Sequence, residues 1–282
     1  MIFKRIDIDT ENNVYLNCYL HEKEPKWNYG FDRPAVVVCP GGGYSMCSPR
    51  EADPIALQYS AKGYNTFVLY YTVGVNAVFP KPLIDLSKAI KIIRENADEW
   101  GVLPNKIAVL GFSAGGHLSA SLGVHWNLPE VTQKSGCENG ENQPNALILC
   151  YPVITTRSWM KNALPRLIGD RDYESTLTLL DCSLNVGSHT PPSFLVHTFM
   201  DNAVSVEESM DFARALDKNN IPFEMHIFPD GPHGLATGDE QTCPANLVCL
   251  SFNKWIELSV LWLKKTFDDK EKPDRTKRAR QV

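Results

Sequence analysis

The sequence predicts an α/β fold, with a mostly parallel twisted sheet, antiparallel strands at the N-terminus, helices on both faces and a small insertion. Two observations support this fold class. Short apolar runs that are typical of buried parallel strands recur along the chain and alternate with helical patterns. One such run, residues 107–110, leads through Gly-Phe-Ser-Ala-Gly at 111–115 into a stretch that favours a helix. A strand, a tight turn and a helix in that order are characteristic of α/β sheets.

The elements can be placed in order along the chain. Alternating apolar residues in 2–8 and 14–20 predict two antiparallel strands. Strands at 36–39 and 66–71 flank a helix at about 51–62, which gives a right-handed crossover. The later predicted elements are an amphipathic helix at 82–99, strands at 107–110, 146–151, 194–197 and 223–228, a helix at about 204–218 and a closing helix at 245–266.

We expect one domain over residues 1–267. Residues 154–190 are irregular and too long for an ordinary connection, so they predict a cap-like insertion over a candidate active site. Residues 127–145 are polar and predict a mobile surface loop. The tail at 268–282 is charged and has no apolar anchors, so we expect it to be disordered.

The composition is that of an ordinary soluble globular protein, with 43% hydrophobic and 22% charged residues. The net charge of −5 gives no sign of nucleic-acid binding. No apolar stretch has the length of a signal peptide core or a membrane span, so we expect a cytoplasmic protein with no membrane contact, and a homodimer is possible. No spacing of Cys or His is typical of a metal site, and we expect no metal or cofactor.

Eight cysteines are present, and without a secretion signal we expect them to be reduced. Cys39 and Cys150 lie inside apolar strand patterns and are interpreted as small buried hydrophobic residues. A disulfide between Cys137 and Cys182, or between Cys243 and Cys249, remains an alternative.

Ser113 is the candidate nucleophile. Between Gly111 and Gly115 on a strand-to-helix turn, its hydroxyl would project from the sheet, and side chains at the two glycines would collide with the neighbouring strand and helix. A single G-x-S-x-G motif is only moderately specific. The prediction therefore depends on whether partner residues follow in a workable order.

Two later segments supply those partners. Asp201 follows the predicted strand at 194–197, and His233 lies in a Gly/Pro loop after the strand at 223–228. The order Ser, Asp, His is the one expected for a serine triad on such a sheet, with His233 as the base and Asp201 as the group that orients it. The alternative is that Asp201 caps the following helix and His233 is an ordinary loop residue.

Three consecutive glycines, 41–43, follow the strand at 36–39. Their bare backbone can approach a substrate oxygen closely, so Gly42 and Gly43, together with the N–H of Ala114, are the predicted oxyanion-hole donors. Which two of the three glycines donate stays open, and a plain glycine turn is the alternative.

Taken together, these motifs resemble the α/β-hydrolase branch that contains acetyl-xylan esterases and bifunctional feruloyl/acetyl-xylan esterases. The resemblance covers roughly residues 30–265 and implies the α/β-hydrolase fold. The sequence departs from the family pattern at two positions. Pro40 stands where lipase-like relatives carry a histidine before the glycines. Met200 stands where an acidic or polar residue is expected just before Asp201, which predicts a more apolar environment for Asp201. The matching segments are PGGGY at 40–44, RE at 50–51, GFSAGGHL at 111–118, HTFMDNAVSVEESMDFARAL at 197–216 and PFEMHIFPDGPHGL at 222–235.

Other residues are weaker candidates. Tyr44 follows the glycines and is a candidate to line the acyl or sugar pocket, and Trp159 in the insertion is a candidate to stack on a sugar or ferulate ring; packing is the alternative for both. We expect His117 to pack beneath the turn and His197 to be a structural hydrogen-bonding residue. Glu51 is predicted to start a helix, where a carboxylate meets the positive end of the dipole.

The resemblance implies a serine carboxylic ester hydrolase that removes a small acyl group, with acetyl the expected one, from a sugar or short oligosaccharide through an acyl-enzyme. The expected partner is therefore a small-molecule ester or acylated sugar. Two alternatives stay open. One is a serine peptidase or amidase of related fold, and the other is a non-catalytic ligand-binding homologue.

Overall fold

A computed structural model describes residues 1–23, 32–157 and 163–268. In this part of the chain eight strands form one sheet in the order β1-β2-β4-β3-β5-β6-β7-β8. Strands β3 to β8 are parallel, and β1 and β2 form an antiparallel edge, as predicted. The bounds are β1 Ile2–Asp9, β2 Val14–Leu20, β3 Arg33–Cys39, β4 Asn65–Tyr70, β5 Val102–Phe112, β6 Ala146–Cys150, β7 Ser193–Thr198 and β8 Phe223–Phe228.

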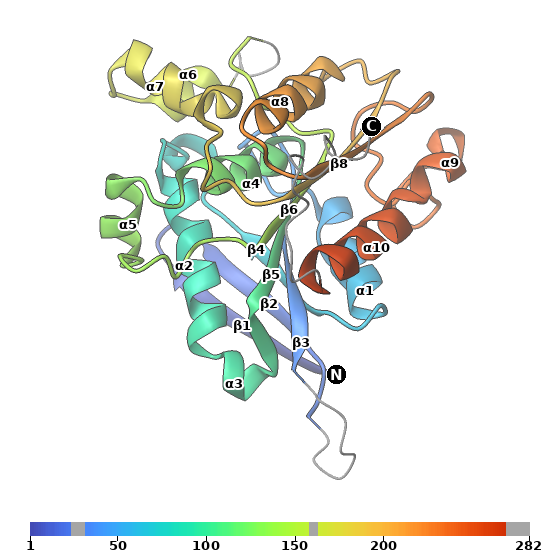
Figure 1. Ribbon diagram of the computed structural model, residues 1–282, viewed down its shortest axis with the longest axis horizontal. Helices are drawn as coiled ribbons and strands as arrows, with labels where there is room; N and C mark the ends of the chain where they lie inside the picture. Colours follow the sequence, from blue (N-terminus) through green and yellow to red (C-terminus); the bar gives the residue numbers. More distant parts are fainter. Residues whose placement is uncertain (24–31, 158–162, 269–282) are drawn as a thin grey trace, which may run out of the picture.

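Helices cover both faces of the sheet (Figure 1). One face is packed by α2, α3, α4 and α8, and the other by α1 and α10, with α5 outside α2. The bounds are α1 Asp53–Ser60, α2 Lys81–Glu95, α3 Ala97–Trp100, α4 Ser113–His125, α5 Pro129–Ser135, α6 Leu164–Ile168, α7 Tyr173–Leu180, α8 Glu207–Lys218, α9 Leu250–Asn253 and α10 Trp255–Asp268.

Strand β3 shows why the central strands are apolar throughout. Val37 and Cys39 face the core under α2 and α4, whereas Val36 and Val38 face the core under α1 and α10, and all four are 0% exposed. Successive side chains of a strand point to opposite faces, so a sheet covered on both sides needs apolar residues at every position. The predicted crossover from β3 through α1 to β4 is confirmed, because these strands pair in parallel.

The prediction of a mobile loop at 127–145 is wrong. Residues 129–135 form α5, and Asn142 is 0% exposed, with its amide donating to Ser87 Oγ and Trp126 O. Arg94 of α2 donates to the backbone carbonyls of Glu141 and Gln143. The polar side chains of this segment therefore fasten it to α2, which its composition alone does not reveal.

The insertion at 154–190 contains more regular structure than its sequence suggests. Besides α6 and α7 it holds a 3-10 turn, η4, at Cys182–Asn185. Asp172 caps α7, since its carboxylate accepts a hydrogen bond from the Ser175 N–H at 2.9 Å. These helices are too short to show a periodic apolar pattern. Trp159 lies outside the described residues.

Two predicted helices are interrupted. The helix at 82–99 is divided into α2 and α3 at Asn96, and the closing helix at 245–266 becomes a 3-10 turn, η5 at Ala245–Leu247, followed by α9 and α10. The predicted tail at 268–282 is described only at Asp268, which ends α10 and pairs with Lys106.

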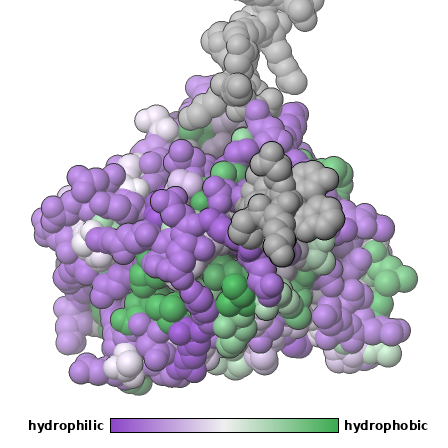
Figure 2. Space-filling view, turned by 90° about the horizontal axis from the view of Figure 1, so that it is seen from below, coloured by the Kyte–Doolittle hydropathy of each residue, from purple (hydrophilic) through white to green (hydrophobic). Residues whose placement is uncertain are grey.

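All eight cysteines are free thiols, so neither alternative disulfide is present. The Cys137 thiol donates instead to Ser87 O, and the Cys182 thiol to His117 O. No helix in the described ranges is long and apolar enough to cross a bilayer. The face seen in Figure 2 is mostly hydrophilic, with hydrophobic areas interrupted by polar side chains.

Candidate active site

Ser113 stands at the turn between β5 and α4. Its φ of +51° lies in the left-handed region, which costs energy for a residue with a side chain and is typical of functional turns. A Cβ at Gly115 would lie 2.1 Å from Cys39 O of β3, and one at Gly111 would lie 2.1 Å from Gly115 O. The interpretation of the two glycines is therefore confirmed, because only glycine lets α4 approach the sheet this closely.

The structure brings Ser113, Asp201 and His233 together at the carboxyl edge of the sheet. His233 Nε2 lies 2.8 Å from Ser113 Oγ, and His233 Nδ1 lies 2.7 Å from Asp201 Oδ2. The three residues follow β5, β7 and β8, which lie far apart in the sequence. Parallel strands end at one edge, so residues that follow different strands can meet there.

The hydrogen-bond partners determine where the protons lie. An ionised carboxylate only accepts, so the Asp201 contact requires the proton of the neutral imidazole on Nδ1. Nε2 then carries the lone pair and accepts the hydrogen bond from Ser113 Oγ. This tautomer leaves a base aimed at the serine hydroxyl.

Asp201 is held by more than His233. Its Oδ1 accepts from the N–H groups of Ala203 and Val204, both at 2.9 Å, and His197 Nε2 lies 3.4 Å from Oδ2. Burial alone would raise the pKa of Asp201, but the hydrogen bonds from His197 and His233 outweigh it and hold the pKa well below its ordinary value. Met200, which precedes Asp201 in the chain, is 59% exposed.

His197 has the structural role predicted for it. Its Nε2 donates to Val204 O at 3.0 Å and its Nδ1 accepts from Ser209 Oγ at 2.8 Å, since a carbonyl can only accept. The ring is 0% exposed and fastens the loop after β7 to α8. His197 therefore supports the conformation in which Asp201 faces His233.

The glycine turn after β3 presents two free donors. The Gly41 N–H donates to Glu51 Oε2 at 2.9 Å, whereas the N–H groups of Gly42 and Gly43 donate to no described residue. Gly42 has φ +127°, and a Cβ there would lie 2.2 Å from Met46 O, so glycine is required at this position. Ala114 belongs to the first turn of α4, where backbone N–H groups lack intrahelical acceptors.

Glu51 supports this turn, a role that the sequence did not reveal. It is 3% exposed; besides the Gly41 bond, its Oε1 accepts from the Tyr151 hydroxyl at 2.8 Å, and that hydroxyl accepts from Ala236 N–H at 2.9 Å. Burial raises the pKa of Glu51 against the lowering effect of Tyr151 and Gly41. The chain Gly41–Glu51–Tyr151–Ala236 thus links the glycine turn to the loop that carries His233.

Glu51 was predicted to start a helix. In the structure it is the last residue of the 3-10 turn η1, Pro49–Glu51, and α1 begins two residues later at Asp53. Its carboxylate points inward instead of capping the helix. The Arg-Glu pair before Asp53-Pro54 looks like an ordinary helix start, and only the long-range contact with Tyr151 distinguishes it.

Replacing Glu51 by Ala is expected to leave the Gly41 N–H and the Tyr151 hydroxyl buried without acceptors. Each such loss costs about 1–3 kcal/mol, so the two together should lower the free energy of unfolding by about 2–6 kcal/mol. Glu51→Gln keeps one carbonyl acceptor and should recover part of this loss. Chemical denaturation measures both variants, with Glu99→Ala at an exposed ion pair as the control. Equal stability of Glu51→Ala and wild type would contradict the role given to Glu51.

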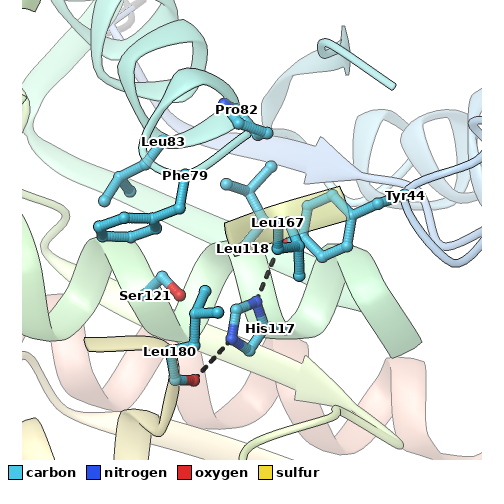
Figure 3. Close-up of a pocket in the computed structure, with 9 residues that line it drawn as sticks. All are labelled: Tyr44, Phe79, Pro82, Leu83, His117, Leu118, Ser121, Leu167 and Leu180. Carbon is cyan, nitrogen blue, oxygen red and sulfur yellow. Dashed lines mark hydrogen bonds between the residues drawn. The ribbon is translucent and has the colours of Figure 1, made fainter. Parts of the chain in front are cut away.

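The position of Tyr44 agrees with packing, the alternative to a residue that lines the pocket. Tyr44 is 2% exposed, and its hydroxyl bonds to His117 Nδ1 at 2.7 Å beneath the glycine turn, so its polar end does not face solvent. His117 is buried below the turn as predicted, at 1% exposure. Figure 3 shows both residues at a small cavity that apolar side chains of α4, α6 and α7 help to line.

Comparisons with known proteins identify the family of the chain. The BD-FAE family model matches residues 23–216, more than half of the chain. Endo-1,4-beta-xylanase B of Butyrivibrio fibrisolvens is 37% identical over 80% of this chain and 35% of its own length, and an acetylxylan esterase of Xylanibacter ruminicola is 30% identical over 83% and 46%. The chain thus spans less than half of the length of these two relatives.

A solved structure matches most of both chains. The acetyl ester-xyloside bifunctional hydrolase from Caldicellulosiruptor lactoaceticus superposes with a TM-score of 0.77 at 33% identity, over 92% of this chain and 90% of that one. The range matched by the family model contains Ser113 and Asp201 and ends before His233. The chain belongs to the BD-FAE family and has the α/β-hydrolase fold.

Proposed function

We propose that this protein is a serine carboxylic ester hydrolase in which Ser113 is the nucleophile, His233 the general base and Asp201 the residue that orients His233. The observation that carries the proposal is the continuous line of hydrogen bonds from Asp201 Oδ2 through both His233 nitrogens to Ser113 Oγ, at 2.7 and 2.8 Å. A serine hydroxyl is a weak nucleophile until an adjacent base takes its proton. This arrangement supplies that base.

The proposed reaction has two halves. Ser113 Oγ attacks the ester carbonyl while its proton passes to His233 Nε2, and the resulting oxyanion is bound by the N–H groups of Gly42, Gly43 and Ala114. When the intermediate collapses, Nε2 returns the proton to the departing alcohol and an acyl-enzyme remains. Water then attacks this ester with the same base and releases the carboxylic acid and free Ser113.

The substrate that we propose is a small acyl ester, with acetyl on a sugar or short xylo-oligosaccharide as the preferred case. The support is the naming of two relatives as an acetylxylan esterase and an acetyl ester-xyloside hydrolase, at 30% and 33% identity. Acyl preference depends on pocket shape, and a single methylene changes discrimination by only about 1–3 kcal/mol. A series of esters is therefore the direct test.

The experiment compares p-nitrophenyl acetate and butyrate, methyl ferulate, acetylated xylo-oligosaccharides and aminoacyl p-nitroanilides. We expect release of acetate from the acetylated sugars, a higher kcat/KM for acetyl than for butyryl esters, and little cleavage of the anilides. If the anilides were cleaved faster than the esters, the protein would be an amidase and the esterase proposal would be overturned. A wild-type protein that cleaves no ester and does not react with a fluorophosphonate would be a non-catalytic homologue and would overturn the proposal.

A further inference from the structure

Tyr44 has an unusual backbone conformation at a critical place. It follows Gly43 directly, and its φ of +56° lies in the left-handed region, where bulky residues are rare. Six described non-glycine residues have positive φ, and Asn13 and Asn220 among them are residue types that tolerate it. A tyrosine does not, so the surrounding contacts must hold Tyr44 in this conformation.

Those contacts hold Tyr44 at both ends. Its carbonyl accepts hydrogen bonds from the Gly74 N–H at 2.8 Å and from Arg166 Nη1 at 3.4 Å. Its hydroxyl bonds to His117 Nδ1 at 2.7 Å, and the two rings meet edge to face (Figure 3). With 2% exposure, the side chain has no solvent to replace a lost partner.

The positions of the protons in the hydrogen bonds between Tyr44, His117 and Leu180 follow from one carbonyl. His117 Nε2 lies 2.8 Å from Leu180 O, and a carbonyl oxygen can only accept, so Nε2 carries the proton. Nδ1 of the neutral ring then accepts, and the Tyr44 hydroxyl is the donor. Burial lowers the pKa of His117, in agreement with a neutral ring. In the relay Tyr44–His117–Leu180, the Tyr44 hydroxyl therefore donates to His117 Nδ1, and His117 Nε2 donates to Leu180 O.

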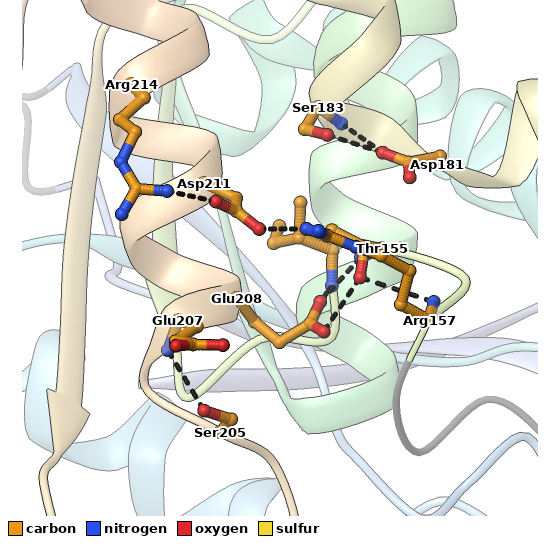
Figure 4. A network of polar contacts seen from close by, with 10 residues as sticks. Thr155, Arg157, Asp181, Ser183, Ser205, Glu207, Glu208, Asp211 and Arg214 are labelled. Carbon is orange, nitrogen blue, oxygen red and sulfur yellow. Dashed lines mark hydrogen bonds and ion pairs between the residues drawn. The ribbon is translucent and has the colours of Figure 1, made fainter.

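Leu180 ends α7, so the relay reaches into the insertion, whose two stems are firmly attached. The Cys182 N–H donates to Ile154 O at 2.9 Å, which joins the stems. Glu208 of α8 accepts from the N–H groups of Ile154 and Thr155 and from the Thr155 hydroxyl (Figure 4). The insertion thus offers a fixed carbonyl at Leu180.

We propose that Tyr44 and His117 are positioning residues of the oxyanion turn: the relay from Leu180 through His117 holds Tyr44 in its strained conformation and so fixes the direction of the Gly42 and Gly43 N–H groups. The inference rests on the proposed function. Both side chains are buried, so we expect their loss to affect the rate of the chemical step and to leave substrate binding unchanged.

The chain offers a matched control in His125. It lies two turns after His117 on α4, is 4% exposed, and its Nε2 bonds to Leu179 O at 2.8 Å, the carbonyl next to Leu180 O. Its ring meets the Phe79 ring edge to face, and its Nε2 bond leads to α7 and not to Tyr44. Replacing either histidine by phenylalanine removes one hydrogen bond to a backbone carbonyl of α7, but only His117→Phe also removes the partner of the Tyr44 hydroxyl.

The experiment measures kcat and KM for p-nitrophenyl acetate, together with the melting temperature, for Tyr44→Phe, His117→Phe and His125→Phe. Removing an oxyanion donor outright costs about 10²–10³ in kcat, so displacement of the turn should lower kcat about 10- to 100-fold for the first two variants, with KM within about twofold. His125→Phe should keep kcat within about threefold while losing as much thermal stability as His117→Phe. The double variant Tyr44→Phe/His117→Phe should lose little more activity than either single one.

The outcomes separate the inference from the proposed function. If the wild type shows Ser113-dependent ester cleavage but Tyr44→Phe keeps its kcat, or His125→Phe loses as much activity as His117→Phe, the relay is merely structural and the inference is overturned. Tyr44→Phe removes one oxygen atom only, so it keeps the test decisive if His117→Phe does not fold. A wild type without esterase activity would reject the proposed function instead.

Discussion

Replacing Ser113 by Ala is expected to lower kcat/KM for p-nitrophenyl acetate by about 10⁵- to 10⁶-fold, because the acyl-enzyme can no longer form. The remaining rate would come from the oxyanion donors and His233 acting on bound water. Alanine adopts the φ of +51° no less readily than serine, so the turn should persist. We therefore expect the melting temperature to be unchanged or slightly higher, as is common when an active-site group is removed.

The measurement combines ester hydrolysis with labelling by a fluorophosphonate, which reacts only with an activated serine. Wild type should be labelled at Ser113 and Ser113→Ala should not be labelled at all. Ser135→Ala is the control, because Ser135 is a buried serine that bonds only within α5 and its neighbourhood. Retention of more than a few per cent of the activity by Ser113→Ala would show that another residue attacks the ester.

The sheet could be predicted because its signal is local and repeated. Residues 35–39 of β3 and 107–112 of β5 are buried on both faces of the sheet, and short apolar runs of this kind are typical of such strands. The segment at 127–145 was mispredicted for the opposite reason. Its stability depends on Arg94 and Ser87, which lie about 50 residues earlier in the chain. Such contacts leave no trace in local composition.

In the candidate site, too, some residues could be predicted from the sequence and others could not. Ser113, Asp201 and His233 could be proposed because each follows a predictable strand, and the end of a parallel strand fixes where the next residue lies. Glu51 and His117 could not be assigned their partners, since the partners Tyr151 and Leu180 belong to other segments of the chain. Sequence motifs therefore predict the groups that react more readily than the groups that hold them.

Replacing Asp201 by Asn is expected to lower kcat by about 10⁴-fold while Ser113 and His233 stay in place. The amide of asparagine can donate to His233 Nδ1, which favours the tautomer that carries its proton on Nε2. That proton would face Ser113 Oγ, and no lone pair would be left to accept the serine proton. Single-turnover kinetics with p-nitrophenyl acetate should show the loss in acylation, with KM little changed.

The same substitution should also change how stability depends on pH. The folded-state pKa of Asp201 is depressed below the ordinary value of about 3.9, so its ionised form stabilises the fold at all pH values above that range, and this contribution is lost as the pH falls through the folded pKa. Wild type should therefore be more stable than Asp201→Asn at pH 7, and the difference should shrink below about pH 4. Denaturation midpoints at pH 3 to 8 provide the measurement.

Asp172→Asn serves as the control for the loss of activity. Asp172 caps the exposed start of α7, and asparagine caps a helix about as well as aspartate, so activity should not change and stability at pH 7 should change little. If Asp201→Asn kept its activity, the His233 tautomer would not depend on this carboxylate. Glu51 is a second buried carboxylate, linked through the Tyr151 hydroxyl to the Ala236 N–H in the loop that carries His233, and the double variant Asp201→Asn/Glu51→Gln would then test whether it takes over. A further fall in that double variant, beyond the loss in Glu51→Gln alone, would identify Glu51 as the substitute.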